Sequence, residues 1–276
     1  IIKNKDLTWT FDANLSTNTN KIKKLYSGRD QIIEGDGIAG STNTLLRPGL
    51  SADTYYLREW AGVDPDTGAP QWLTTDANGD RVITKNYAKA DQVALDKRAT
   101  PNVFGSFSTT LMYKGFDLNA VFGYSLGAYI YNYSRQEYDS DGAYTDRNQF
   151  SLQKGWKRWK QKGDIATHPV AAYNNPSNAN KASTRYLESA DFLKLRSVTL
   201  GYNFNLKSQF VKALRVYVSG ENLFCITDYS GVDPELPAAD GGRDASGERS
   251  TALSISTGAG VYPSVRKFML GVNVTF

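Results

Sequence analysis

The chain has 276 residues, a net charge of +4 with both signs spread along it, and 40% hydrophobic residues. Its single cysteine, Cys225, excludes an intramolecular disulfide framework or a cysteine-rich zinc site, and its single histidine, His168, excludes a metal site built from several histidines. No apolar run approaches the roughly 20 residues of a membrane-spanning helix, so helical membrane proteins are excluded as well. The scattered charge argues against a nucleic-acid-binding stripe.

Apolar residues alternate with polar ones in six runs, and this period of two predicts β-strands. In chain order the runs lie at residues 9–16, 106–113, 116–127, 198–204, 214–219 and 268–276. Only Lys114 and Gly115 separate the second run from the third, which predicts a tight hairpin. The runs approach the 9–11 residues or so that a tilted strand needs to cross a bilayer, whereas strands of ordinary globular proteins average about 5–6 residues.

Short turns alternate with long polar stretches between these runs. The turns are Lys114–Gly115 and residues 205–212, and the longest polar stretches are residues 133–189 and 230–261. This asymmetry, with Tyr and Trp near the ends of the runs, is typical of outer-membrane barrels. We therefore predict an all-β fold, an antiparallel transmembrane β-barrel with long loops at one end. A soluble β-sandwich, whose strands alternate in the same way, is the alternative.

The alternation also assigns faces to the predicted strands. We expect one set of side chains to point to lipid (Phe107, Leu111, Phe116, Leu118, Phe122, Leu200, Val216, Leu270 and Val272) and another to point inward (Asp117, Asn119, Thr199, Gly201, Ser219 and Asn273). By the same alternation, Lys194 and Arg196 would point to lipid, because they lie at the same parity as the apolar residues of that strand. Because Lys or Arg at the bilayer midplane costs about 2–4 kcal/mol, we expect that end of the strand either to rise above the hydrocarbon or to contain a bulge.

Two sequence strings resemble catalytic or nucleotide-binding motifs but lack their context. Residues 35–40 spell G-x-G-x-x-G without the strand and helix that a dinucleotide site needs, so we expect a loop. Residues 123–127 spell G-x-S-x-G, but Ser125 lies inside a predicted strand, whereas a nucleophile elbow opens a helix. We expect no catalytic residue, and a serine hydrolase using Ser125 and His168 is kept as an alternative.

Three further stretches invite ligand interpretations. Residues 64–68 and 76–80 carry closely spaced aspartates, but Arg81 stands where a calcium loop of the EF-hand type needs glycine, so turns are expected in place of metal sites. Residues 154–160 interleave basic and aromatic side chains, as single-strand nucleic-acid binders do. We expect instead a structured loop that packs its tryptophans.

Several stretches occur together in a characteristic order. They are residues 60–68 (WAGVDPDTG), 113–118 (YKGFDL), 163–165 (GDI), 189–202 (SADFLKLRSVTLGY), 215–224 (RVYVSGENLF), 229–235 (YSGVDPE) and 262–263 (YP). Together they resemble the SusC/RagA family of TonB-dependent outer-membrane transporters of Bacteroidota.

The resemblance implies that residues 1–276 are the C-terminal part of a plugged barrel of about 22 strands. The plug, the TonB box and the earlier strands would then lie outside this chain. It also implies active import of oligosaccharides or peptides across the outer membrane, energised through TonB. The implied partners are a SusD-like surface lipoprotein, the rest of the barrel and plug, and membrane lipid. No enzyme activity, cofactor, metal or nucleic acid is expected. A secreted β-sandwich that binds carbohydrate is the alternative function.

The candidate substrate contacts are five inward residues and two loop aromatics: Asp117, Asn119, Tyr217, Ser219, Glu221, Trp156 and Trp159. The inward residues could instead form hydrogen bonds within the sheet of the barrel or to the plug. The two aromatic residues could instead pack against the SusD-like lid.

The two ends of the chain carry expectations of their own. The chain starts at Ile1 without a methionine or a signal peptide, so we expect it to be a piece of a longer protein. The last run is expected to be a native end and a signal for barrel assembly through Phe268, Leu270, Val272, Val274 and Phe276. Because strands in hydrocarbon cannot leave an open edge, the strand near Trp9 and the last strand should pair with strands outside this chain.

Overall fold

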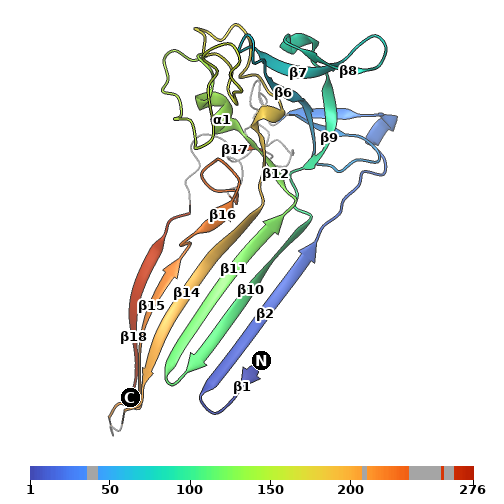
Figure 1. Cartoon of the computed structure of the whole chain (residues 1–276). Coiled ribbons are helices and arrows are strands. Elements are labelled where there is room, and N and C mark those ends of the chain that lie inside the picture. Colours follow the sequence, from blue (N-terminus) through green and yellow to red (C-terminus); the bar gives the residue numbers. More distant parts are fainter. Residues whose placement is uncertain (36–42, 207–209, 236–255, 258–263) are drawn as a thin grey trace.

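Two regions make up the molecule: a long curved sheet, here called the wall, and a layer of loops and small sheets at one end of it, the loop layer (Figure 1). The structure is a computed structural model that describes residues 1–35, 43–206, 210–235, 256–257 and 264–276. Both chain termini lie at the end of the wall away from the loop layer (Figure 1).

Six long strands form the wall, and they match the six predicted runs: β2 (Leu7–Thr17), β10 (Val103–Tyr113), β11 (Phe116–Leu126), β14 (Phe192–Phe204), β15 (Ala213–Glu221) and β18 (Lys267–Thr275). With the short strands β1 (Ile2–Lys3) and β16 (Cys225–Thr227) they make an eight-stranded sheet among the described residues. Its order is β1-β2-β10-β11-β14-β15-β18, with β16 beside β14, and every pairing is antiparallel. The described part of the chain places no second sheet against the wall (Figure 1), so the sandwich alternative is not supported.

The strand register separates the two predicted faces. Leu118 lies opposite Leu111 on one neighbouring strand and Leu200 on the other. Asn119, the next residue, lies opposite Thr110 and Thr199. Directly paired residues share a face, so an apolar row and a polar row each continue across the strands. The predicted division into an apolar face and a polar face is confirmed.

A β-bulge interrupts this register at the loop end of β14. Val121 pairs with Ser197, but the next residue, Phe122, pairs with Leu195, so Arg196 is the extra residue. The shift places Leu195 on the apolar face and Lys194, which pairs with Gly123, on the polar face. Of the two alternatives expected from the parity of the two cations, the structure shows the bulge.

The two ends of the wall differ in their connections. The hairpin between β10 and β11 turns through Lys114 and Gly115, whose φ angles of 46° and 90° fit the tight turns with two left-handed residues that match strand twist. The connection between β14 and β15 is also short, although residues 207–209 of it lie outside the described residues. At the opposite end, the connections form the loop layer (Figure 1).

In the part of the chain that the structure describes, the loop layer contains three small sheets and one short helix. The sheets consist of β3 (Ile32–Gly35), β4 (Asn43–Leu46), β5 (Thr54–Arg58) and β9 (Gln92–Arg98); of β6 (Trp60–Val63), β7 (Pro70–Thr75) and β8 (Arg81–Thr84); and of β12 (Tyr129–Asn132), β13 (Leu187–Ser189) and β17 (Ser256–Thr257). The helix is α1 (Tyr133–Tyr138), and single 3₁₀ turns lie at Tyr26–Gly28, Tyr87–Lys89 and Thr184–Tyr186. Of the helices that the structure describes, none has the length and apolar character to cross a bilayer.

The loop layer contains a hydrophobic core. Its buried residues are Tyr55, Leu57, Tyr131, Tyr186 and Leu187, contributed by the first and third small sheets and the 3₁₀ turn between them. A smaller cluster of Ala128, Ile130, Ala190 and Tyr229 lies beside it. On the wall, by contrast, large apolar side chains of the apolar face stay exposed, Leu270 at 78% and Phe11 at 55%.

Candidate functional site

The polar face of the wall carries a band of uncharged hydrogen-bonding side chains. One continuous row runs across neighbouring strands through Thr10, Thr110, Asn119, Thr199 and Ser219. Within it, the amide of Asn119 donates a hydrogen bond of 2.8 Å to the hydroxyl of Thr110. These short side chains leave hydroxyl and amide groups facing the space on this side of the sheet. Such a surface can hydrogen-bond to water, to another part of the protein or to a polar solute.

A charged pair lies on the same face nearer the turns. Nε of Arg215 donates to Oδ1 of Asp117 at 2.9 Å, and the amide of Asn203 donates to the same oxygen at 2.8 Å. The guanidinium of Arg215 also lies over the ring of Tyr217, 4.7 Å from its centre. The pair borders a concavity of about 550 Å³ that Lys5 helps to line. Asp117, a candidate substrate contact, is therefore already held by two partners within the wall.

The remaining candidates on the polar face differ in how open they are. The ring of Tyr217 lies against Gly271, where a Cβ atom would come within 2.2 Å of it. Ser219 is buried, and Glu221 forms an ion pair of 3.5 Å with Lys267 on the neighbouring strand. All three share the polar face with Asp117 and Asn119, as their pairing across β14, β15 and β18 shows.

The two tryptophans proposed as loop contacts are packed within the loop layer. The ring of Trp156 carries the guanidinium of Arg135 at 4.3 Å and lies 5.1 Å from the ring of His168. Trp159 donates its indole N–H to the carbonyl of Pro65 at 2.9 Å, and its ring covers Gly68. Gly68 has φ 69° and no room for a Cβ atom, so glycine is required there on both counts. The expectation of a structured loop that packs its tryptophans is confirmed.

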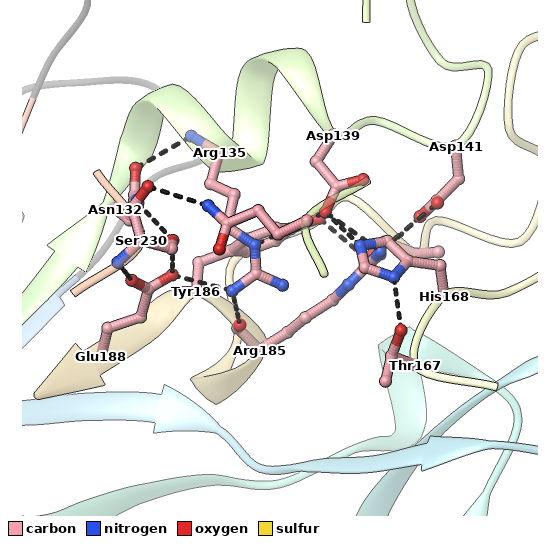
Figure 2. A network of polar contacts seen from close by, with 12 residues as sticks. Asn132, Arg135, Asp139, Asp141, Thr167, His168, Arg185, Tyr186, Glu188 and Ser230 are labelled. Carbon is pink, nitrogen blue, oxygen red and sulfur yellow. Dashed lines mark hydrogen bonds and ion pairs between the residues drawn. The ribbon is translucent and has the colours of Figure 1, made fainter. Parts of the chain in front are cut away.

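Buried charges form the most extensive polar network of the loop layer (Figure 2). Asp139 and Asp141 follow α1, and the guanidinium of Arg185 reaches both carboxylates. Arg158 donates to Asp141 at 2.6 Å, and Nε2 of His168 donates to Asp139 at 2.6 Å. All but the half-buried Arg158 are buried. The network fastens the long connection between β12 and β13 to itself at several points.

A second branch of the network continues toward the wall. The guanidinium of Arg135, on α1, donates to Glu188 at 2.8 Å, and Glu188 accepts hydrogen bonds of 2.7 Å from both the backbone N–H and the hydroxyl of Ser230 (Figure 2). The side-chain oxygen of Asn132 accepts the backbone N–H of Arg135 and so caps α1. Residues from β12, α1, β13 and the chain after β16 therefore meet at one point.

The electrostatics of these groups follow from burial and pairing. Burial alone would raise the pKa of Asp139, but the hydrogen bond from His168 and the charge of Arg185 hold it below its ordinary value. Burial raises the pKa of Tyr186 as well. Near β6, the hydrogen bonds from Lys85 and Thr67 lower the pKa of Asp64 to about 2. Asp64 and Asp139 are therefore charged partners of cations and of hydrogen-bond donors.

The aspartate-rich stretches form turns, as expected. The backbone N–H of Asp66 donates to Asp64 at 3.0 Å, and Lys85 supplies the cation there. The backbone N–H groups of Asn78 and Asp80 both donate to Asp76 at 2.9 Å, which closes the hairpin between β7 and β8. Within the described ranges, no three His, Cys, Asp or Glu side chains are grouped as a metal ion would need.

The two motif-like strings behave differently. Ser125 lies within β11, and His168 contacts Asp139 and Thr167 in the loop layer, so the strand context predicted for the G-x-S-x-G string is confirmed. For the G-x-G-x-x-G string, β3 ends at Gly35 and residues 36–42 lie outside the described residues.

Sequence reasoning missed the partners of the charges in the network. The alternation indicated that Lys194 and Arg196 needed a special environment, but it did not identify their partners. These partners, Asp233 and Glu235, lie about forty positions further along the chain. Arg185 and Asp141 are 44 positions apart. No local spacing connects such residues.

Comparison with known proteins agrees with this architecture, although no family model matches the sequence. The whole chain is similar to the TonB-dependent receptor P3 of Formosa agariphila (29% identity), to the receptor P39 of the same organism (30%), and to the TonB-dependent receptor SusC of Bacteroides thetaiotaomicron (27%). It spans 27%, 29% and 25% of these receptors, respectively.

Solved structures give the same result. The fold matches the RagAB peptide transporter with a TM-score of 0.78 and 26% identity over the whole chain, which spans 28% of that protein chain. The closed-closed state of the RagAB peptide importer matches with a TM-score of 0.75. The open sheet with one apolar and one polar face is thus a portion of a larger antiparallel barrel, and the predicted resemblance of the chain to the SusC/RagA family of TonB-dependent receptors is confirmed.

Proposed function

We propose that this chain is the C-terminal part of an outer-membrane transporter that imports oligosaccharides or peptides with energy supplied through TonB. The observation that carries the proposal is the division of the wall into two faces. Rows such as Leu111, Leu118 and Leu200 suit contact with lipid, and the parallel row through Asn119 suits a hydrated interior.

The open edges of the wall support the view that it works as part of a larger barrel. Among the described residues, the outer edge of β2 is paired at Trp9 and Thr8 with the two residues of β1, and β18 at the other end of the sheet is paired on one side, with β15. In hydrocarbon, an unsatisfied backbone group costs several kcal/mol, so each edge needs a strand from the rest of the receptor. The long loops would face the cell exterior, where a SusD-like lipoprotein would be the partner.

Candidate contacts for the imported solute remain Asp117, Asn119, Tyr217, Ser219 and Glu221 on the polar face, and Trp156 and Trp159 in the loop layer. Asn119 and its neighbouring hydroxyls offer neutral hydrogen-bonding groups that suit sugars and peptide backbones alike. The two tryptophans are packed against neighbours, so a substrate would meet only their remaining exposed edges.

Uptake in whole cells tests this function. Cells that carry the full-length receptor and its neighbouring lipoprotein would be supplied with fluorescent oligosaccharides or peptides, with and without TonB. We expect accumulation that requires both the receptor and TonB. We also expect that either the oligosaccharides or the peptides accumulate, but not both. Accumulation that is independent of TonB would contradict active import, and binding by the isolated secreted chain without a membrane would favour the carbohydrate-binding alternative.

A further inference from the structure

Residues 229–235, here called the inner segment, connect the loop layer to the wall. The segment follows β16, and its first residue, Tyr229, packs in the small apolar cluster with Ile130. Ser230 is bound by Glu188 through two hydrogen bonds of 2.7 Å. One end of the segment is therefore fixed to the loop layer.

The other end is held by the two cations at the bulge. Nζ of Lys194 donates to Asp233 at 2.9 Å, to Glu235 at 3.1 Å and to Ser264, just before β18, at 3.2 Å. Arg196 donates to Glu235 through both terminal nitrogens, one of them at 2.8 Å. The backbone N–H of Glu235 closes the cluster by donating to Asp233 at 3.0 Å.

This cluster lies on the polar face of the wall. Lys194 pairs with Gly123, and the side chain of Arg196 lies over Gly123, where a Cβ atom would come within 2.7 Å of Nε. Without the bulge, both cations would point to the apolar face. The extra residue in β14 thus turns the cations toward the interior, where the carboxylates of the inner segment meet them.

Because Lys194 and Asp233 are buried, each of these charges needs its partner. Lys194 is 3% exposed and Asp233 is 7% exposed, so neither can exchange its partner for bulk water. Burial alone would raise the pKa of Asp233, yet the hydrogen bonds from Lys194 and from the N–H of Glu235 hold it below its ordinary value. Loss of one partner would leave the other charge buried and unpaired.

We propose that Lys194 and Arg196 are positioning residues that hold the inner segment against the polar face, so that this segment lines the passage through the barrel at its loop end. The proposal rests on the proposed function only in that the interior of the barrel is taken as the path of the imported solute. The attachment of the segment to the wall can be measured whether or not the receptor imports anything.

Thiol labelling of the full-length receptor in outer membranes measures this attachment. Cys225 is replaced by serine and Pro234, which is buried, by cysteine; a membrane-impermeant maleimide then reports how often residue 234 is accessible. We expect Lys194→Met to raise the labelling rate roughly tenfold or more, because an unpaired buried charge favours local opening. Lys194→Arg, which keeps a cation, should label nearly at the parent rate.

Controls separate this role from general destabilisation. Lys267→Met removes an exposed ion pair with Glu221 on the neighbouring strands and should leave labelling unchanged. Heat-modifiable migration verifies that each barrel is folded. If Lys194→Met fails to assemble, Arg196→Gln, at a half-exposed position, carries the test with a smaller expected rise. Labelling at the parent rate in a folded Lys194→Met or Arg196→Gln receptor overturns the proposal, and absence of TonB-dependent uptake in the parent receptor overturns only the proposed function.

Discussion

The wall and the loop layer are stabilised in different ways. In the wall, each strand from β2 to β18 is paired through its backbone with the next strand of the sheet. Apolar side chains such as Leu270 remain exposed on one face. In the loop layer, strands are short, and buried side chains such as Tyr55 and Arg185 hold the segments together. The stability of the wall depends on the alternating pattern of its strands and on what surrounds its apolar face. The stability of the loop layer depends on contacts between particular side chains that are far apart in the sequence.

The largest expected effect is the loss of Arg185 from the buried network. Arg185→Met leaves Asp139 and Asp141 buried with fewer cations, and removal of one partner of a buried ion pair costs about 3–5 kcal/mol. We expect hydrogen exchange in residues 133–190 of the full-length receptor to accelerate strongly while the wall stays protected. Arg147→Met, which breaks the ion pair of the exposed Arg147 with the half-buried Glu137, is the matched control and should cost about 1 kcal/mol. Equal acceleration in wall and loop layer would contradict the division into two regions.

A second prediction addresses the faces of the wall. Leu200→Arg places a cation on the apolar face, and a cation at the bilayer midplane costs about 2–4 kcal/mol. Thr199→Arg, one position earlier, points to the polar face and should cost clearly less. Urea unfolding of the full-length barrel in lipid vesicles measures both. A larger cost for Thr199→Arg would show that the face assignment is inverted.

Close packing between a glycine and an aromatic ring gives a third, smaller effect. In Gly271→Val, the new side chain would meet the ring of Tyr217, and overpacking costs about 1–3 kcal/mol even though valine favours strands. In the double variant with Tyr217→Ala, the penalty should largely vanish, because the ring is gone. Additive costs in a double-mutant cycle would mean that the ring does not lie on Gly271. Asn273→Val, two residues along the same face of β18, serves as the control.

The two regions also differ in how far the sequence predicts them. All six long strands, the hairpin at Lys114 and Gly115, and the bulge follow from alternation, because each depends on residues close together in the chain. The partners of Arg185 and Lys194 do not, because they are brought together only by the complete topology. The long polar stretch around them identified the packed tryptophans as loop residues, but it gave no indication that Trp159 would cover Gly68 or that Arg135 would lie over Trp156.

The smallest effect is a response to acid that should reach the loop layer before the wall. The pKa values of Asp139 and Asp233 are lowered in the folded chain, and that of Asp64 is lowered to about 2. A carboxyl group whose pKa is lowered by folding contributes stability that is complete above its ordinary value of about 4 and is lost as the pH falls through the folded value. The loop layer should therefore loosen between about pH 4 and pH 2.

Tryptophan fluorescence can follow this transition. Four of the five tryptophans, Trp60, Trp72, Trp156 and Trp159, lie in the loop layer, and only Trp9 lies in the wall. We expect an emission shift in this pH range while heat-modifiable migration of the full-length barrel is unchanged, since backbone pairing in the wall does not titrate. Asp64→Asn removes one of the titrating groups without removing its bulk, so it should shift the transition only slightly, whereas Asp139→Asn should shift it more. If the emission shift and the loss of heat-modifiable migration occurred at the same pH, the wall and the loop layer would unfold as one unit. The two modes of stabilisation would then not act separately.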